Sequence, residues 1–200
     1  MVANKLTRGQ RTSAAALIAV ALAIPAEGLR TIAYRDPVGI PTICFGSTRG
    51  VQMGDRATVQ ECHRLLSEEM LQAIYTVERC VPGLPIKVLA AFADTVYNAG
   101  PTIACSTTGS TARKLLLAQD YDGACLQLGR WNKARVAGAL VELPGLTKRR
   151  AAATKLCVDW RVDPLVLEPA FFTAPAKRAP APAWRPMVSI PVAYHVEMTA

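Results

Sequence analysis

The sequence predicts an α+β fold in which one helix precedes a small β-hairpin sheet and about five further helices follow. Three observations support this order. An uncharged, alanine-rich apolar run covers residues 13–26, a stretch rich in glycine and proline covers residues 29–52, and apolar residues recur at helical spacing beyond residue 58. The 200 residues suffice for one domain with a substantial core and additional segments, and no internal repeat is visible.

The first element, within residues 1–26, has the layout of a secretory signal. Lys5, Arg8 and Arg11 precede the apolar run, and no acidic residue accompanies them. At about 1.5 Å per residue the run reaches roughly 21 Å, short of the ~30 Å hydrocarbon core of a bilayer. Three interpretations are open: a cleaved signal peptide ending at Ala23, an ordinary soluble helix, or a segment that enters the membrane, tethers the chain and later leaves it. We favour the last, because alanine gains far less from lipid than leucine does.

The second element is a small sheet within residues 29–52. Thr31, Ile32 and Tyr34 favour strand structure, whereas the Pro-Val-Gly segment at 37–39 and the Phe-Gly-Ser segment at 45–47 favour turns. The stretch therefore predicts short strands joined as a hairpin.

The helices that follow carry clear start and stop signals. Thr58-Val-Gln-Glu61 is a capping-box pattern that opens an amphipathic helix, and Pro82 and Pro85 end it. A second helix ends at Gly100 before Pro101. That second helix is expected over residues 86–98, and the two helices expected next cover residues 110–117 and 121–131. Residues 143–146 are interpreted as a turn, after which Thr147 caps a last helix through Trp160.

The C-terminal residues 161–200 have a different character. Seven of the fourteen prolines lie between Pro164 and Pro191, in low-complexity sequence that cannot carry a helix. We expect an extended, disordered tail with little core of its own. It is either an inert extension or a weak wall- or membrane-binding arm that uses Lys177, Arg178, Trp184 and Arg185.

The net charge and the cysteine content limit which partners the protein can bind and in which compartment it folds. The net charge of +8 suits an anionic partner, which includes nucleic acid, a membrane surface or an acidic polymer such as peptidoglycan. With two histidines, no zinc-finger spacing and no glycine-rich phosphate loop, we expect no metal and no cofactor. Six cysteines without a Cys-x-x-Cys pair suggest disulfides and an oxidising compartment, with buried free thiols as the alternative.

The candidate chemistry is concentrated in Glu27, Asp36 and Thr42. Hydrolysis of a glycosidic bond needs an acid that protonates the leaving oxygen and a base or nucleophile opposite it. Glu27 directly follows the apolar run, so partial desolvation should favour its protonated form, whereas Asp36 lies in polar turn sequence and should stay ionised. The Thr42 hydroxyl can hold a water near Asp36. This pattern suggests single displacement with inversion; a retaining route with Asp36 as nucleophile is the alternative.

Residues 27–48 closely resemble the catalytic signature of the phage-type lysozymes, the endolysins of glycoside hydrolase family 24. The resemblance covers roughly residues 26–158 and extends to segments 92–100, 130–131 and 143–150. It implies a lysozyme-like fold, in which a β-hairpin lobe and a mostly helical lobe enclose a cleft, and the same three catalytic roles for Glu27, Asp36 and Thr42.

The same resemblance suggests further roles. Supporting or saccharide-contacting positions would be Asn98, Arg130 and Arg149. The plainer alternatives are a helix-capping Asn98, a Trp131 in the core, and a solvated basic face made by Arg130, Arg149 and Arg150. One departure is Ser47, which stands where related endolysins usually carry histidine and so removes a hydrogen-bond or ion-pair support beneath the sheet. The sequence alone leaves every disulfide pairing open, and the resemblance favours Cys44–Cys62, Cys80–Cys105 and Cys125–Cys157.

The sequence therefore predicts an N-acetylmuramidase that cleaves the β-1,4 bond between N-acetylmuramic acid and N-acetylglucosamine in peptidoglycan. We expect a monomer without a nucleic-acid partner, exported to the periplasm and first tethered to the inner membrane by a signal-arrest-release segment. The expected division is an export segment (1–26), a catalytic domain (27–160) and the tail (161–200). The alternatives are a non-catalytic wall- or membrane-disrupting protein on the same fold, a lytic transglycosylase, and a nucleic-acid binder, which has only the net charge in its favour.

Overall fold

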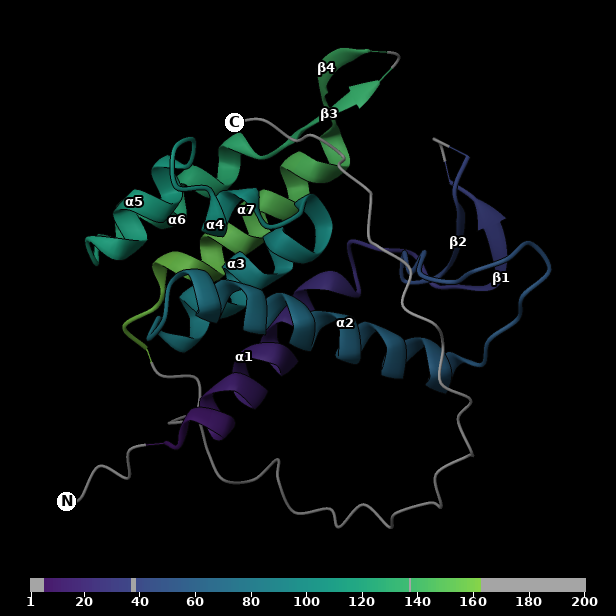
Figure 1. Ribbon diagram of the computed structural model, residues 1–200, viewed down its shortest axis with the longest axis horizontal. Helices are drawn as coiled ribbons and strands as arrows, with labels where there is room; N and C mark the ends of the chain where they lie inside the picture. The colour runs from purple at the N-terminus through teal and green to yellow at the C-terminus, as the bar shows by residue number, and fades with distance from the viewer. Residues whose placement is uncertain (1–5, 37–38, 137, 163–200) are drawn as a thin grey trace.

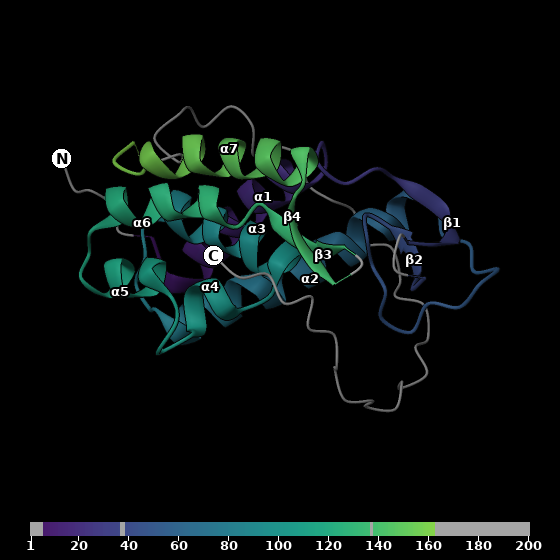
Figure 2. The ribbon, with the colours of Figure 1, turned by 90° about the horizontal axis from the view of Figure 1, so that it is seen from above.

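In the computed structural model of the protein, residues 6–36, 39–136 and 138–162 are described. The α+β class and the order of helix, small sheet and helices are confirmed (Figure 1). The sheet lies at one end of the molecule and the shorter helices gather at the other, with a long helix reaching from one to the other (Figures 1 and 2). The elements that position the site are α1 (Arg8–Ala23), β1 (Arg30–Arg35), β2 (Pro41–Cys44), α2 (Val59–Cys80), α3 (Ile86–Ala99) and α7 (Pro144–Val158).

Helix α1 begins at a capping box, in which Thr7 and Gln10 exchange hydrogen bonds with each other's main chain. One face of the helix carries small side chains that are buried against α2 and α3, whereas Leu17 on another face is 61% exposed. Because an alanine side chain is short, this face lets the helix axes approach closely. The buried residues are Thr12, Ala14, Ala15, Ala16, Ala19 and Ala23.

Helices α2 and α3 form the centre of the core. The predicted capping box at Thr58 and Glu61 is confirmed, and it opens α2 at Val59. Helix α3 is buried over nearly its whole length and ends where Gly100 takes a φ of 81°. Only glycine adopts that conformation without strain, which explains the helix end that the sequence predicts.

The small sheet consists of β1 and β2 paired antiparallel. Tyr34 lies opposite Thr42 and Arg35 opposite Pro41, with an irregularity in register between Arg30 and Tyr34. This register places Thr42 on the strand that follows the Asp36 turn. Its side chain is 3% exposed.

Three disulfides hold these elements together, and they are the pairs that the family resemblance favours. Cys44–Cys62 ties β2 to α2, Cys80–Cys105 ties the end of α2 to the short helix α4 (Thr102–Cys105), and Cys125–Cys157 ties α6 (Tyr121–Gln127) to α7. All six cysteines are paired, so the alternative of buried free thiols is wrong.

The structure corrects several sequence predictions. Helix α7 begins at Pro144, so residues 143–146 are not a separate turn and Thr147 is not the cap. Proline fits the first helical position because its fixed φ suits the helix and its missing N–H is not needed there. The predicted helix 121–131 divides into α6 and a 3-10 turn, η1 (Leu128–Arg130). The prediction of a disordered tail falls on residues 163–200, which lie outside the described residues.

Two elements were missed altogether. Helix α4 is a single short turn, and strands β3 (Lys133–Val136) and β4 (Ala139–Glu142) form a second hairpin. The hairpin projects from the helical part, and every residue of β4 is exposed (Figure 1). A strand that is exposed throughout, as β4 is, has no reason to alternate apolar and polar residues, so the sequence carries no period-2 signal there. The remaining helix, α5 (Thr111–Leu117), starts after Ser110 as predicted.

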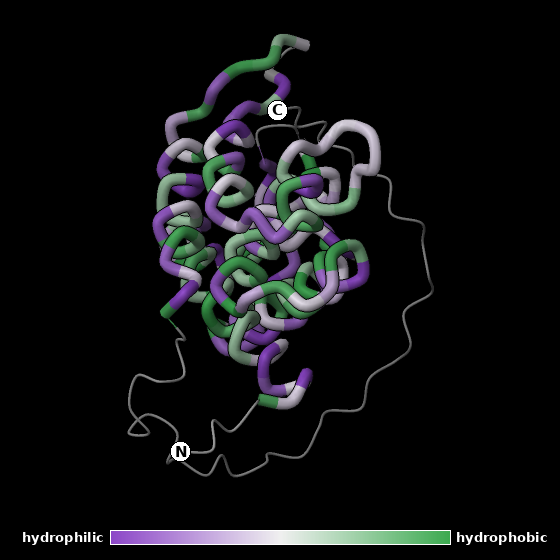
Figure 3. The backbone as a smooth tube through the Cα atoms, turned by 90° about the vertical axis from the view of Figure 1, so that its left-hand side faces the viewer, coloured by the Kyte–Doolittle hydropathy of each residue, from purple (hydrophilic) through white to green (hydrophobic). Residues whose placement is uncertain are grey.

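The distribution of hydropathy follows this architecture. Hydrophobic and hydrophilic stretches alternate along the helical turns (Figure 3). Within the described part of the chain, no helix combines the length and the apolar character that crossing a bilayer requires.

Candidate active site

Glu27 lies in the connection between α1 and β1. Its main-chain N–H donates to the carbonyl of Ala23, 2.9 Å away, so the end of α1 fixes its position. The side chain is 23% exposed and forms an ion pair with Arg149 of α7. The sequence predicted a partly desolvated acid at this position, but it did not predict a buried guanidinium beside it.

Arg149 connects Glu27 to a second carboxylate. Its side chain is 4% exposed, and its Nη2 donates to Oδ1 of Asp94 at 2.7 Å while its Nε donates at 3.1 and 3.2 Å. Burial acts to lower the pKa of Arg149, but the hydrogen bonds and charges of Asp94 and Glu27 outweigh it, so the pKa is raised. The guanidinium therefore stays charged between two carboxylates, which favours a supporting role over direct contact with a saccharide.

Arg150 completes the buried network. It donates to Thr95 Oγ1 at 2.8 Å, to the carbonyl of Trp131 at 3.2 Å and to Asn98, and it lies 3.5 Å from Asp94. Burial lowers the pKa of Arg150 to about 10, so it too is charged at neutral pH. Both guanidiniums thus lie against the Asp94 carboxylate, and Arg149 also binds the carboxyl group of Glu27.

Asp36 and Thr42 are joined through the main chain of Ile40. Asp36 Oδ1 accepts from the Ile40 N–H at 2.8 Å, and the Asp36 N–H donates to the Ile40 carbonyl at 3.0 Å. The Thr42 hydroxyl donates to the same carbonyl at 3.0 Å. A hydroxyl that donates one hydrogen bond still has lone pairs that accept another, so Thr42 can bind a water.

The turn after β2 brings the sheet against Glu27. Gly46 has a φ of 97°, and a Cβ atom placed on it would lie 3.5 Å from Glu27 Oε2 and 3.9 Å from the Tyr97 hydroxyl. Tyr97 of α3 donates its hydroxyl to the Phe45 carbonyl at 2.8 Å. Glu27 is therefore bordered by the sheet on one side and by Arg149 of the helical part on the other.

The other predicted residues lie in different settings. Asn98 accepts from buried Arg150, so it belongs to the network behind Glu27. Arg130 is exposed at the end of η1 and donates to Gln127 at 3.2 Å. The interpretation of Arg149 and Arg150 as a solvated basic face is wrong, because both are buried. Trp131 is 3% exposed and lies in the core, as the plainer interpretation held.

Sequence reasoning missed Asp94, Tyr97 and Glu69. Asp94 carried a usable signal, since it is the one charged residue in the run 88–96, where Thr95 is the only other polar residue, and it is fully buried. A buried carboxylate requires a buried cation. Tyr97 and Glu69 carried no such signal, because a tyrosine or glutamate at helical spacing is unremarkable.

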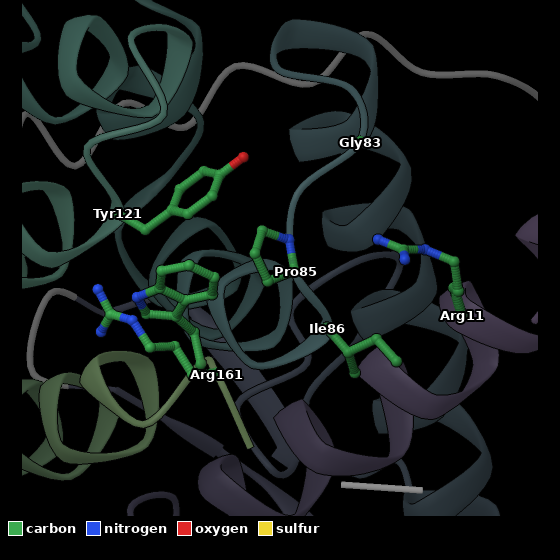
Figure 4. Close-up of a pocket in the computed structure, with 7 residues that line it drawn as sticks. Arg11, Gly83, Pro85, Ile86, Tyr121 and Arg161 are labelled. Carbon is green, nitrogen blue, oxygen red and sulfur yellow. The ribbon is translucent and has the colours of Figure 1, made fainter. Parts of the chain in front are cut away.

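The hollow drawn in Figure 4 is a separate feature. It has a volume of about 310 Å³ and lies between the first turns of α1, the loop before α3, α6 and the end of α7 (Figure 4). Its lining residues are Arg11, Gly83, Pro85, Ile86, Tyr121, Trp160 and Arg161. No carboxyl side chain lines it, so it lacks the acid that glycoside hydrolysis requires. In the described residues, no group of three or more His, Cys, Asp or Glu side chains is placed to hold a metal ion.

Comparison with known proteins places the chain in context. The sequence profile named phage lysozyme matches residues 25–153. The SAR-endolysin of Pseudomonas phage phiKMV is 38% identical over 158 residues, which cover 78% of this chain and 93% of that protein. The SAR-endolysin of Enterobacteria phage P21 is 30% identical over 134 residues, which cover 66% of this chain and 77% of that protein.

Solved structures agree on the fold. The endolysin from Escherichia coli O157:H7 phage FAHEc1 superposes with a TM-score of 0.60 at 27% identity, covering 81% of this chain and 98% of that one. The active form of the P1 phage endolysin Lyz superposes with a TM-score of 0.63 at 23% identity, covering 74% of this chain and 86% of that one.

Proposed function

Because the chain belongs to the phage lysozyme family, we propose that it is an endolysin that hydrolyses the β-1,4 bond between N-acetylmuramic acid and N-acetylglucosamine in peptidoglycan. This reaction would lyse the bacterial host. The observation that carries the proposal is the setting of Glu27, whose carboxylate borders the Gly46 turn of the sheet and is bound by Arg149 of the helical part. A carboxyl group held between two lobes is placed to reach a bond that lies across both of them.

Glu27 would protonate the leaving oxygen of the glycosidic bond. Arg149 fixes the carboxyl in one orientation, which a general acid needs. Because Asp94 binds the same guanidinium, part of the positive charge that Arg149 directs at Glu27 is compensated. Arg149 thus orients the acid without being an isolated cation beside it.

Asp36 would act as the base that activates water, with the Thr42 hydroxyl holding that water. Hydrogen bonds with the main chain of Ile40 fix both side chains on the hairpin: its N–H donates to Asp36, and its carbonyl accepts from Thr42. We propose single displacement, which inverts the anomeric configuration; the retaining alternative uses Asp36 as nucleophile. Proton NMR of freshly cleaved oligosaccharide distinguishes the two, since inversion gives the α-anomer first and retention gives the β-anomer.

The central test is wall lysis by wild type and by Glu27→Gln. Glutamine keeps the shape and can still accept from Arg149, but it cannot donate the acid proton. We expect activity to fall about 10²- to 10⁴-fold, the range that a general acid contributes. Mass spectrometry of the products should find reducing muramic ends. Equal clearing by both proteins would show wall disruption without catalysis, and anhydro-muramic ends would show a transglycosylase.

We also propose that the N-terminal segment first enters the inner membrane and later packs as α1. The three disulfides fit an oxidising periplasm, and the alanine face of α1 fits both settings because it is apolar yet gains little from lipid. On this proposal residues 1–26 serve export, residues 27–160 form the catalytic domain, and packing of α1 sets the position of Glu27. N-terminal sequencing of active periplasmic protein tests it, since a start at Ile24 or Glu27 would exclude release without cleavage.

Arg130 remains the proposed saccharide contact outside the buried network. It is exposed, and its guanidinium donates to the neutral side chain of Gln127. Asn98 is better placed to support Arg150 than to touch a sugar. Replacing Arg130 with alanine should therefore raise KM and leave kcat unchanged, as expected when a contact binds substrate and transition state equally.

A further inference from the structure

A second carboxyl group, Glu69 of α2, lies beneath the turn that borders Glu27. Its Oε2 accepts a hydrogen bond from the Ser47 hydroxyl at 2.9 Å. Ser47 is 4% exposed, and its main chain forms a bridge with Ile43 in both directions at 2.9 Å. Serine at this position therefore does not leave the sheet unsupported, because the carboxyl of Glu69 provides the support from below.

Tyr97 of α3 holds the same turn from another side. Its hydroxyl donates to the Phe45 carbonyl at 2.8 Å. The turn Cys44–Ser47 is thus fixed on either side of Gly46 by side chains from two different helices. The Cys44–Cys62 disulfide adds a third tie to α2.

The position of Gly46 connects this support to the reaction. Its Cα faces the Glu27 carboxylate closely enough that an added Cβ would be in van der Waals contact with Oε2. A displacement of the turn by a few tenths of an ångström would therefore change the space available to the acid. Misplacement on this scale lowers the rate of the chemical step more than it lowers substrate binding.

We propose that Glu69 is a positioning residue for the reaction, which acts through Ser47 to hold the Cys44–Ser47 turn against Glu27, while Tyr97 holds the same turn at Phe45. This inference rests on the proposed role of Glu27 as the acid. It assigns a function to a half-buried glutamate outside the three catalytic candidates Glu27, Asp36 and Thr42, and it explains why the Glu69 carboxyl, the Ser47 hydroxyl and the Tyr97 hydroxyl are all found at one turn.

The kinetic test uses a series at position 69. Glu69→Gln keeps an acceptor for Ser47, so we expect kcat within about 3-fold of wild type. Glu69→Leu removes that acceptor, so we expect kcat to fall about 10-fold while KM changes less than 2-fold, since one lost hydrogen bond of about 1.4 kcal/mol corresponds to a tenfold change. The matched control is Glu68→Leu, because Glu68 is the neighbouring exposed glutamate and pairs only with Arg64 in the described contacts. It should leave kcat unchanged.

A double-mutant cycle tests the path through Ser47. Ser47→Ala should lower kcat about as much as Glu69→Leu, and the double variant should be no worse than either single variant, because the two residues share one interaction. If Glu69→Leu fails to fold, Ser47→Ala decides in its place. Additive losses would overturn the proposed path, and unchanged kcat in both single variants would overturn the proposal itself.

Amide hydrogen exchange gives a readout that does not require activity. Glu69→Leu should speed exchange at the Ser47 N–H, which bonds to Ile43, and Glu68→Leu should not. The proposed function is judged separately, by the comparison of wild type with Glu27→Gln. If exchange at Ser47 in Glu69→Leu equals that in wild type, the positioning role is contradicted, even if the protein is an active muramidase. If exchange is faster but the wild-type protein does not lyse walls, Glu69 supports the turn, and only its proposed effect on catalysis is contradicted.

Discussion

The helical side and the sheet side hold the candidate active site by different physical means. On the helical side, Glu27 is fixed by charge, through Arg149, Asp94 and Arg150, which are all buried. On the sheet side, Asp36 and Thr42 are fixed by hydrogen bonds to the main chain of Ile40. Removing one partner of a buried ion pair leaves an uncompensated charge and costs much stability. Removing one side-chain hydrogen bond from a turn costs only the contribution of that bond. We therefore expect substitutions in the buried network that holds Glu27 to affect folding most, and substitutions that remove hydrogen bonds on the sheet side to affect catalysis more than stability.

The strongest test of this contrast is Asp94→Leu. It leaves two buried guanidiniums facing one carboxylate, and breaking a buried pair by removing one partner costs about 3–5 kcal/mol. Thermal unfolding should show a large fall in Tm, with Asp94→Asn intermediate because it keeps acceptors for Arg149. The matched control is Glu68→Leu, which breaks the exposed pair with Arg64 and should leave Tm nearly unchanged. A similar Tm for both leucine variants would show that the buried network does not stabilise the fold.

The sequence predicted the sheet side more completely than the helical side. Asp36 and Thr42 lie within one short stretch of chain, so the local sequence was enough to propose them, and the structure joins them through the main chain of Ile40. Asp94 and Arg149 belong to helices far apart in the chain, and only tertiary packing brings them to Glu27. Helix boundaries set by local chemistry, such as the Thr58 capping box and Gly100, were predicted, whereas the exposed β3–β4 hairpin had no local signal.

The disulfides allow the two sides to be weakened separately. Cys44–Cys62 closes 18 residues on the sheet side, and Cys125–Cys157 closes 32 residues on the helical side. Replacing either pair with alanines should cost about 2–4 kcal/mol of unfolding free energy, slightly more for the longer loop. Only the loss of Cys44–Cys62 should also lower kcat at a temperature where both variants are folded, because Cys44 begins the turn beside Glu27. Equal loss of kcat in the two variants would contradict the division into two sides.

A smaller effect is expected at Thr42, where valine and serine variants separate packing from chemistry. The Ile40 carbonyl keeps its bond from the Asp36 N–H when the hydroxyl is removed, so Thr42→Val should change stability by no more than about 1 kcal/mol. If the hydroxyl holds the attacking water, kcat should fall about 10-fold, the equivalent of one hydrogen bond. Thr42→Ser keeps the hydroxyl and should retain most of the activity. Full activity in Thr42→Val would remove the hydroxyl from the mechanism.

The smallest expected effect is a pH dependence of stability that originates on the sheet side, at Glu69. Burial is the main cause that raises the pKa of Glu69, and it outweighs the opposing hydrogen bonds from Ser47 and Tyr97 and the charge of Arg49; the neighbouring Glu68 raises it slightly further. The folded state therefore holds this proton more tightly than the unfolded state does. The stabilisation is complete below the unfolded pKa of about 4.5 and is lost as the pH rises through the folded pKa. Unfolding free energies measured across this range should decline less steeply with pH in Glu69→Gln than in wild type, while Glu68→Gln should keep the wild-type slope. If the unfolding free energy of wild type and of Glu69→Gln changes equally with pH, the Glu69 carboxyl ionises in the folded protein at no cost in stability. The sheet side would then be insensitive to charge, in contrast to the buried ion pairs of the helical side.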